Sequence, residues 1–77
     1  MLMIPKEKRN SIQLLISGSL EFHFELSFIY LHGDQIMHFI GTVHSLNEGT
    51  DEIRAVNRFN DIVLMQLKDL IAIYSIT

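Results

Sequence analysis

The chain has 77 residues, of which 48% are hydrophobic, a formal net charge of −3 and no cysteine. This length allows one small domain. The missing cysteines exclude disulfides and thiolate metal sites. The acidic net charge argues against general affinity for nucleic-acid phosphates. A domain this short buries only about 60–65% of the surface its unfolded chain exposes. So apolar a composition therefore predicts an obligate homo-oligomer, and we expect it in the cytoplasm.

Several function classes lack any supporting pattern. No apolar run reaches the roughly 18 residues of a membrane span, so no membrane association is expected. No phosphate loop, dinucleotide fingerprint or glycine-flanked nucleophile is present. We therefore expect no enzymatic activity and no cofactor.

The first part of the chain predicts a lead-in and a short helix. Residues 1–10 read as an irregular segment that carries Lys6, Lys8 and Arg9, and residues 11–77 as a single β-barrel domain. Ser11 suits a helix N-cap and Gly18 the position just past a helix end, which favours a two-turn helix between them. The alternation of apolar residues in the same stretch leaves a short strand as the alternative.

Residues 20–46 predict one long β-hairpin folded about Gly33-Asp34. Apolar and polar residues alternate from Leu20 to Phe28 and again in the return strand from Gln35 to Leu46, which indicates strands with one buried face. A two-residue turn makes the numbers of paired residues sum to 67 and aligns the two apolar faces. The resulting pairs are Phe28 with Phe39, Leu26 with Gly41, and Phe24 with Val43.

The rest of the chain predicts three shorter strands. Gly41 lies in mid-strand, where a glycine marks a bulge or a sharp bend. The sequence then predicts strands over 52–57, 61–67 and 71–76, of which the second is buried on both sides. Turns are expected over 47–51, at Asn60-Asp61 and over 68–70. A helix followed by five strands, the second of them bent, predicts a mainly β fold of the small Sm-like or SH3-like barrel class.

The segment from Phe24 to Ile76 resembles the small Sm-like barrel of YolD-like bacterial and phage proteins, and more distantly the Sm and Hfq group. The resemblance is carried by the acidic-glycine turn at Gly33-Asp34 after an aromatic strand, by the glycine-containing strand around Gly41, and by the final apolar spacing of Val63, Leu67, Leu70 and Ile73. In Sm proteins two loops hold RNA, and only Asn47 and Lys68 stand where their ligands would stand. The resemblance therefore implies a ring-forming protein in which these two residues contact RNA.

Two further residue groups are candidates for ligand binding. Arg54 and Arg58 flank the third strand, and Tyr30, Phe59 and Tyr74 are possible stacking platforms for bases. Alternatively, Phe59 closes the barrel end and the tyrosines pack at interface margins, while Asp51, Glu52 and Asp61 neutralise the arginines.

The hairpin register also places His23 opposite His44. Cross-strand Cβ atoms lie about 4.5–5.5 Å apart, close enough for two imidazoles and a carboxylate to share a metal ion. The simpler interpretation is a solvated pair whose mutual repulsion lowers stability on acidification.

The apolar strand from Ile62 to Leu67 would be an aggregation hazard if it stayed unpaired, which predicts strand addition between subunits. The expected interface residues are Ile62, Leu64, Met65, Ile71 and Ile73. The sequence as a whole predicts a self-associating, non-enzymatic regulatory or adaptor module that binds a protein or small-ligand partner. The alternative is an RNA-binding Sm-like ring.

Overall fold

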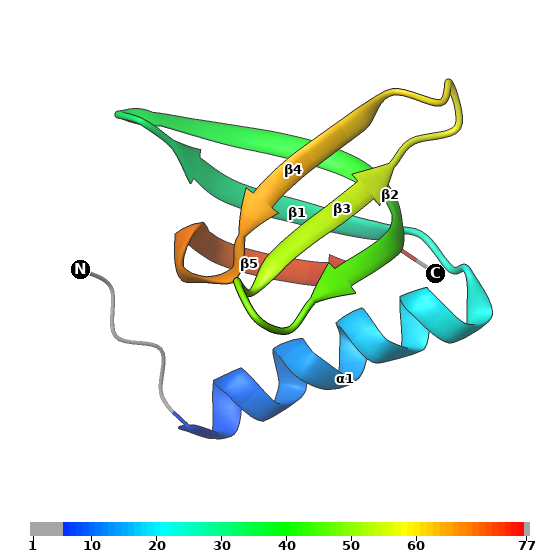
Figure 1. Ribbon diagram of the computed structural model, residues 1–77, viewed down its shortest axis with the longest axis horizontal. Helices are drawn as coiled ribbons and strands as arrows, with labels where there is room; N and C mark the ends of the chain where they lie inside the picture. Colours follow the sequence, from blue (N-terminus) through cyan, green and yellow to red (C-terminus); the bar gives the residue numbers. More distant parts are fainter. Residues whose placement is uncertain (1–5, 77) are drawn as a thin grey trace.

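The chain forms a helix followed by five antiparallel strands in one sheet (Figure 1). The structure, a computed structural model, describes the backbone of residues 6–76 and the side chains of residues 11–76. The elements in chain order are α1 (Lys6–Phe22), β1 (Leu26–His32), β2 (Gln35–Asn47), β3 (Glu52–Val56), β4 (Ile62–Gln66), the 3₁₀ turn η1 (Leu67–Asp69) and β5 (Leu70–Ser75).

Helix α1 is longer than predicted in both directions. Residues 6–10 are helical, so the expected irregular lead-in is wrong for that part, while residues 1–5 lie outside the described part of the chain. The buried residues Ile12, Ile16 and Ser19 are spaced to lie on one face of the helix. Leu20 and Phe22 were expected to begin the first strand, but they are exposed residues of the last helical turn.

The helix ends at His23, a residue with a left-handed backbone. Its φ is 61°, and its N–H donates to the Ser19 carbonyl at 2.8 Å. This is the usual way for a helix to end, although glycine is more common at such a position. The first strand therefore begins at Leu26, and the predicted pair of Phe24 with Val43 is not part of the ladder.

The hairpin of β1 and β2 has the predicted register. Leu26 pairs with Gly41, Phe28 with Phe39, and His32 with Gln35. Gly33 has a φ of 62°, which the first position of a two-residue hairpin turn requires.

Strand β2 bends and belongs to both halves of the sheet. Its residues 35–41 pair with β1, and residues 42–47 pair with β3. A Cβ atom added at Gly41 would lie 2.8 Å from the carbonyl carbon of Val56 and 2.8 Å from the ring of Phe39. Only a glycine allows β3 to approach this closely, which confirms the bend predicted at Gly41.

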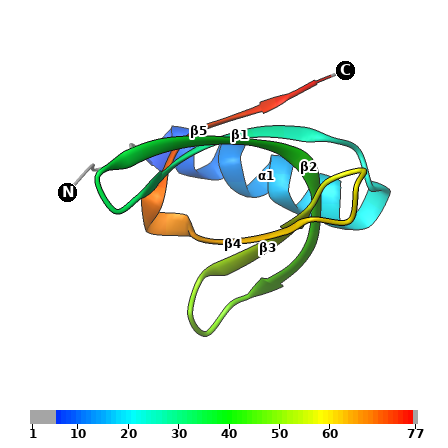
Figure 2. The ribbon, with the colours of Figure 1, turned by 90° about the horizontal axis from the view of Figure 1, so that it is seen from above.

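The five strands form an open sheet, not the closed barrel that was expected. The strand order is β4-β3-β2-β1-β5, so β4 and β5 are its two edges. Figure 2 shows β1 and β5 in one layer and β3 and β4 in another, with β2 curving between them. The protein is mainly β as predicted. However, β4 is not buried on both sides, because Ile62 and Leu64 are 58% and 51% exposed.

The core lies between the curved sheet and α1. Fully buried side chains come from the helix and from four strands, and they are Ile16 and Ser19, Leu26 and Phe28, Val43, Ile53, and Leu70.

Ser19 links the helix to the bent strand. Its buried Oγ donates to the Phe24 carbonyl at 2.7 Å and accepts from the Val43 N–H at 3.0 Å. Val43 adjoins the bulge where the register between β2 and β3 shifts. The serine hydroxyl thus satisfies a strand amide at an interruption of the regular ladder.

Replacing Gly41 by alanine should destabilise the protein strongly. The added methyl group would press against the β3 backbone, which cannot yield as a side-chain tip can, so we expect a loss of about 3 kcal/mol and a fall in Tm of more than about 10 °C. Gly49→Ala is the control, because its Cβ would meet only the tip of Asn47 at 3.3 Å. Thermal unfolding followed by circular dichroism measures both. Equal Tm values for the two variants would contradict the close approach at Gly41.

Replacing Ser19 by alanine should cost about 2–3 kcal/mol, because it leaves a buried N–H and a partly buried carbonyl without their partner. Ser17→Ala, at an exposed position of the same helix, should be neutral or slightly stabilising. Urea unfolding at equilibrium compares the two free energies of unfolding. A Ser19→Ala variant as stable as Ser17→Ala would refute the bridging role of the hydroxyl.

Candidate functional site

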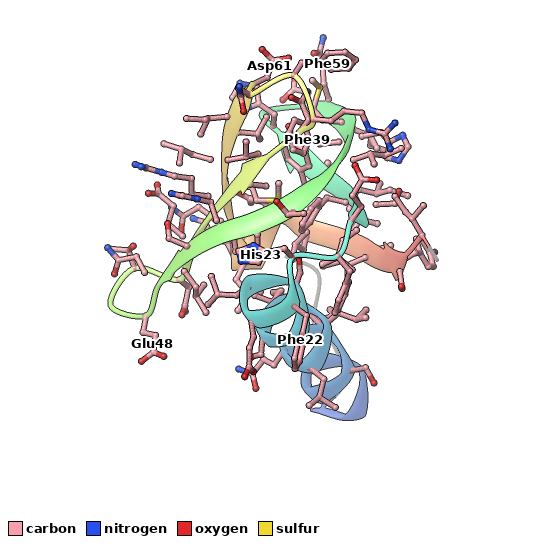
Figure 3. All side chains as sticks on the ribbon, turned by 90° about the vertical axis from the view of Figure 1, so that its right-hand side faces the viewer. Phe22, His23, Phe39, Glu48, Phe59 and Asp61 are labelled. Atoms are coloured by element: carbon pink, nitrogen blue, oxygen red, sulfur yellow. The ribbon has the colours of Figure 1, made fainter. Side chains whose placement is uncertain are left out.

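The four predicted contact residues do not form one site. Asn47 and Lys68 share one end of the molecule, where the Leu67 N–H donates to the Asp51 carbonyl at 2.9 Å and ties η1 to the turn between β2 and β3. Arg58 follows β3 at the opposite end. Figure 3 shows these two ends, with Glu48 near one and Phe59 and Asp61 at the other. Arg54 is exposed on β3 between them.

The side chain of Asn47 holds its own turn. Its Oδ1 accepts hydrogen bonds from the N–H groups of Gly49 at 3.0 Å and Thr50 at 3.3 Å. This is the local pattern that makes asparagine common in turns. The oxygen is therefore engaged within the chain.

Arg58 is paired with a residue distant in the sequence. Its guanidinium donates to Glu25 Oε1 at 2.9 Å, and this hydrogen bond together with the charge of Glu25 raises the pKa of Arg58 above its ordinary value. Asp61, which was expected to neutralise an arginine, instead accepts from Asn57 Nδ2 at 3.1 Å. The ion pair connects the loop between β3 and β4 to the segment that precedes β1.

An open groove of about 570 Å³ surrounds this ion pair. Phe59 stands at its rim with 78% of its surface exposed, whereas Phe39 is half-buried and packs against Phe28 with ring centroids 6.5 Å apart. The lining residues are Glu25, His38, Phe39, Ile40, Asn57, Arg58 and Phe59.

Of the three proposed stacking platforms, Tyr30 is buried in the core and cannot stack on a base, while Phe59 and Tyr74 are exposed.

The loop that carries Phe59 is held by one residue that the sequence analysis missed. Asn57 Oδ1 accepts from the N–H groups of Phe59 and Asp61, each at 2.9 Å, and the Asn57 carbonyl accepts from the Asn60 N–H at 3.1 Å. An asparagine directly before a turn is the signal that could have identified it.

The predicted cross-strand pairing of His23 with His44 is wrong, because the ladder of β1 and β2 begins at Leu26. His23 ends α1 and lies outside the strands, while His44 occupies the bulge of β2 opposite β3. Over the residues that the structure describes, no group of three or more His, Asp or Glu side chains is arranged to hold a metal ion. The expected loss of stability on acidification was argued from this cross-strand pairing and stays a prediction.

The predicted interface residues divide into exposed and buried sets. Ile62 and Leu64 project from β4 into solvent, and Ile71 is half-buried. Met65 and Ile73 belong to the core, so their side chains are not on the surface.

Both edge strands direct main-chain groups outward. In an antiparallel ladder, residues that bond to the neighbouring strand alternate with residues whose main-chain groups point away from it. Two hydrogen bonds fix this alternation for β3 and β4: Asn57 N–H to the Asp61 carbonyl, and Leu67 N–H to the Asp51 carbonyl. The main-chain groups of Ile62 and Leu64 consequently point away from β3, toward the open edge. On β5, the hydrogen bond from the Ile76 N–H to the Glu25 carbonyl fixes the same alternation. The main-chain N–H and carbonyl of Ile73 therefore point away from β1.

A smaller cavity of about 200 Å³ lies beside β5, where α1 runs past it. Its lining is largely apolar and comprises Ser11, Ile12, Leu15, Ala72, Ile73 and Tyr74.

Comparison of the chain with protein-family models, with curated proteins and with solved structures found no match. Within the described residues, no helix is both long and apolar enough to cross a membrane.

Replacing Asn57 by alanine should loosen the loop that presents Phe59. The N–H groups of Phe59 and Asp61 lose their shared acceptor, so their hydrogen exchange should accelerate, with a loss of about 1 kcal/mol in stability. Asp61→Ala removes the bond from Asn57 Nδ2 but keeps Asn57 Oδ1 as the acceptor, so it should preserve the protection. Exchange measured amide by amide by NMR provides the comparison. Unchanged exchange in Asn57→Ala would contradict the role given to this side chain.

Proposed function

We propose that the chain is a non-enzymatic regulatory or adaptor module that assembles with copies of itself by adding strand β4 of one subunit to strand β5 of the next. The observation that carries this proposal is the open sheet, whose two edges lie at opposite ends of the strand order. An exposed strand edge is a template for pairing with another chain.

The two edges have complementary hydrogen-bonding groups. Leu64 on β4 and Ile73 on β5 direct their N–H and carbonyl groups outward, with the two-residue spacing of an antiparallel ladder. Side chains that would block such pairing are scarce, because β4 and β5 contain no Asp, Glu, Lys, Arg or Pro. These are the residues that natural edge strands use to prevent association.

The edges are also complementary in shape. Ile62 and Leu64 project from β4, and the cavity of about 200 Å³ beside β5 is lined by the apolar side chains of Ile12, Leu15 and Ile73. A protruding aliphatic side chain on one edge and an apolar cavity beside the other suit a head-to-tail contact, in which different surfaces of two identical subunits meet.

The arrangement of elements supports an Sm-like character for this module. A helix precedes five antiparallel strands, the second strand is bent, and a 3₁₀ turn joins the last two. In this proposal the sheet that stays open within one subunit is continued between subunits. A repeated head-to-tail contact of this kind forms a ring when its rotation closes.

RNA binding in the Sm manner receives less support. Asn47 uses its side-chain oxygen to hold its own turn, Arg58 is paired with Glu25, and Tyr30 is buried. Among the residues whose side chains the structure describes, Arg54 and Lys68 are the other basic residues, and two charges leave little to neutralise phosphates. We therefore propose a protein partner, either another copy or a second protein, as the principal ligand.

The edge contact predicts a specific effect of proline at position 64. The Leu64 N–H points away from β3, so Leu64→Pro removes an outward donor without breaking the ladder between β3 and β4, and the subunit should stay folded. Assembly through the strand edges should be lost, which lowers the native mass, and Leu64→Ala, which keeps the N–H, should weaken edge pairing less. Native mass by light scattering on a sizing column compares these variants with the unmodified chain.

An unmodified chain that is monomeric, or a Leu64→Pro variant of unchanged assembly mass, would refute the edge contact. Retention of single-stranded RNA by the assembly, with steep loss on added salt, would instead favour the RNA-binding alternative.

A further inference from the structure

The sheet has an apolar outer face on the side of β5, β1 and β2 away from the core. Leu26, Phe28 and Tyr30 of β1 point into the core, so the residues between them point outward. Cross-strand pairing places residues of β2 and β5 beside them in the same rows. The apolar members of this outer face are Ile29, Leu31, Ile36, Ile40, Ala72 and Tyr74.

The outer face is exposed over much of its area. Ile36 is 69% exposed, Tyr74 57% and Ile40 43%, and they come from two different strands on either side of β1. A contiguous apolar patch of this kind marks an interaction surface more often than scattered exposed residues do.

The outer face carries no formal charge. Strands β1, β2 and β5 contain no Asp, Glu, Lys or Arg. Apart from the hydroxyl of Tyr74, its polar side chains are Ser27 and His38, which hydrogen-bond to each other across the strands. Burying the face would therefore cost little in unpaired polar groups. A neutral surface can also meet an identical surface without bringing like charges together.

Charged side chains stand at both ends of the outer face. Asp34 lies in the hairpin turn at one end. At the other end Glu25 holds Arg58, which is 73% exposed and contacts Glu25 through one guanidinium nitrogen. A guanidinium has five N–H donors, so Arg58 can bind a second carboxylate.

The spacing of these charges suits a two-fold axis. Nine residues of extended chain, about 30 Å, separate Glu25 from Asp34, and the row of Ile29 and His38 lies near the midpoint. Consider a two-fold axis that lies between two stacked outer faces and runs parallel to that row. It would place the hairpin turn of one copy over the Arg58 end of the other. Both halves of such an interface are then the same, as a dimer with two-fold symmetry requires.

We infer that the outer face binds the outer face of a second copy, with Asp34 of each copy meeting Arg58 of the other. This contact is separate from the edge contact between β4 and β5 and does not rest on it. It uses outward side chains of β1, β2 and β5, whereas the edge contact uses main-chain groups of β4 and β5 and the side chains of Ile62 and Leu64. The two contacts adjoin at Ala72 and Tyr74, which also line the cavity beside β5.

Charged substitutions on the outer face test the contact in a Leu64→Pro background, which removes edge pairing. That parent variant should sediment as a concentration-dependent dimer. Adding Ile36→Lys or Ile40→Lys buries a charge in the contact and should raise the dimer Kd about a hundredfold or more. Leu14→Lys, on the exposed side of α1, is the matched control and should leave the Kd unchanged.

Charge reversal tests the identity of the partner. Asp34→Arg alone and Arg58→Asp alone should each weaken the dimer. The double reversal should restore it, because the two exchanged charges would again attract each other across the axis. Because these positions are exposed, each variant should fold, and circular dichroism melts check that it does.

A parent variant that stays monomeric at high concentration would overturn the inference, as would a dimer whose Kd responds equally to Leu14→Lys and Ile36→Lys. Failure of the double reversal to recover any affinity would overturn the proposed orientation. A dimer of the Leu64→Pro parent that Ile36→Lys breaks would support the outer-face contact even if the unmodified chain showed no edge assembly.

Discussion

The hydroxyl group of Ser19 is the contact on which the arrangement of helix and sheet depends. It lies in the core, donates to the carbonyl of Phe24 and accepts from the N–H of Val43, while the main-chain carbonyl of the same residue accepts from His23. One residue thereby helps end the helix, positions the connection to β1 and satisfies an amide of β2 beyond its bend. Because every buried side-chain polar atom among the described residues has a partner, the helix can close the core without an unsatisfied group.

Strand β2 changes its partner at Gly41, from β1 before it to β3 after it. A chain of this size can form only short strands on either side of the bend, and β3 and β4 have five residues each. The first half of β2 carries β1 and β5, and the second half carries β3 and β4. Each half of the sheet consequently ends in a strand that has one partner.

The sequence predicted most of the strands because their signals are local. The turn at Gly33-Asp34 and the alternating apolar residues on both sides were enough to give the register of the hairpin. The same reasoning failed before Leu26, because Leu20, Phe22 and Phe24 alternate as strand residues do. There the helix prevails through the burial of Ile12 and Ile16 and the contacts of Ser19, which depend on distant residues.

The candidate site could be predicted only in part for the same reason. The position of Asn47 in a turn followed from its neighbours, but its side-chain contacts did not. Glu25 and Arg58 are 33 positions apart, and no periodic pattern links them. The predicted pair of His23 and His44 failed because it inherited the misplaced start of the first strand. Local patterns thus gave the elements, while contacts between distant segments decided which side chains meet.

The two proposed contacts differ in symmetry, and their combination has a geometric consequence. The edge contact joins different surfaces of two subunits and can be repeated from one subunit to the next, whereas the outer-face contact joins identical surfaces and is complete once two subunits meet. A ring built by the first contact would still carry most of the outer face of every subunit, because Ile29, Leu31, Ile36 and Ile40 lie on β1 and β2, away from the strand edges. Pairing of those faces would then join subunits two by two, and a closed assembly that uses both contacts must contain an even number of subunits.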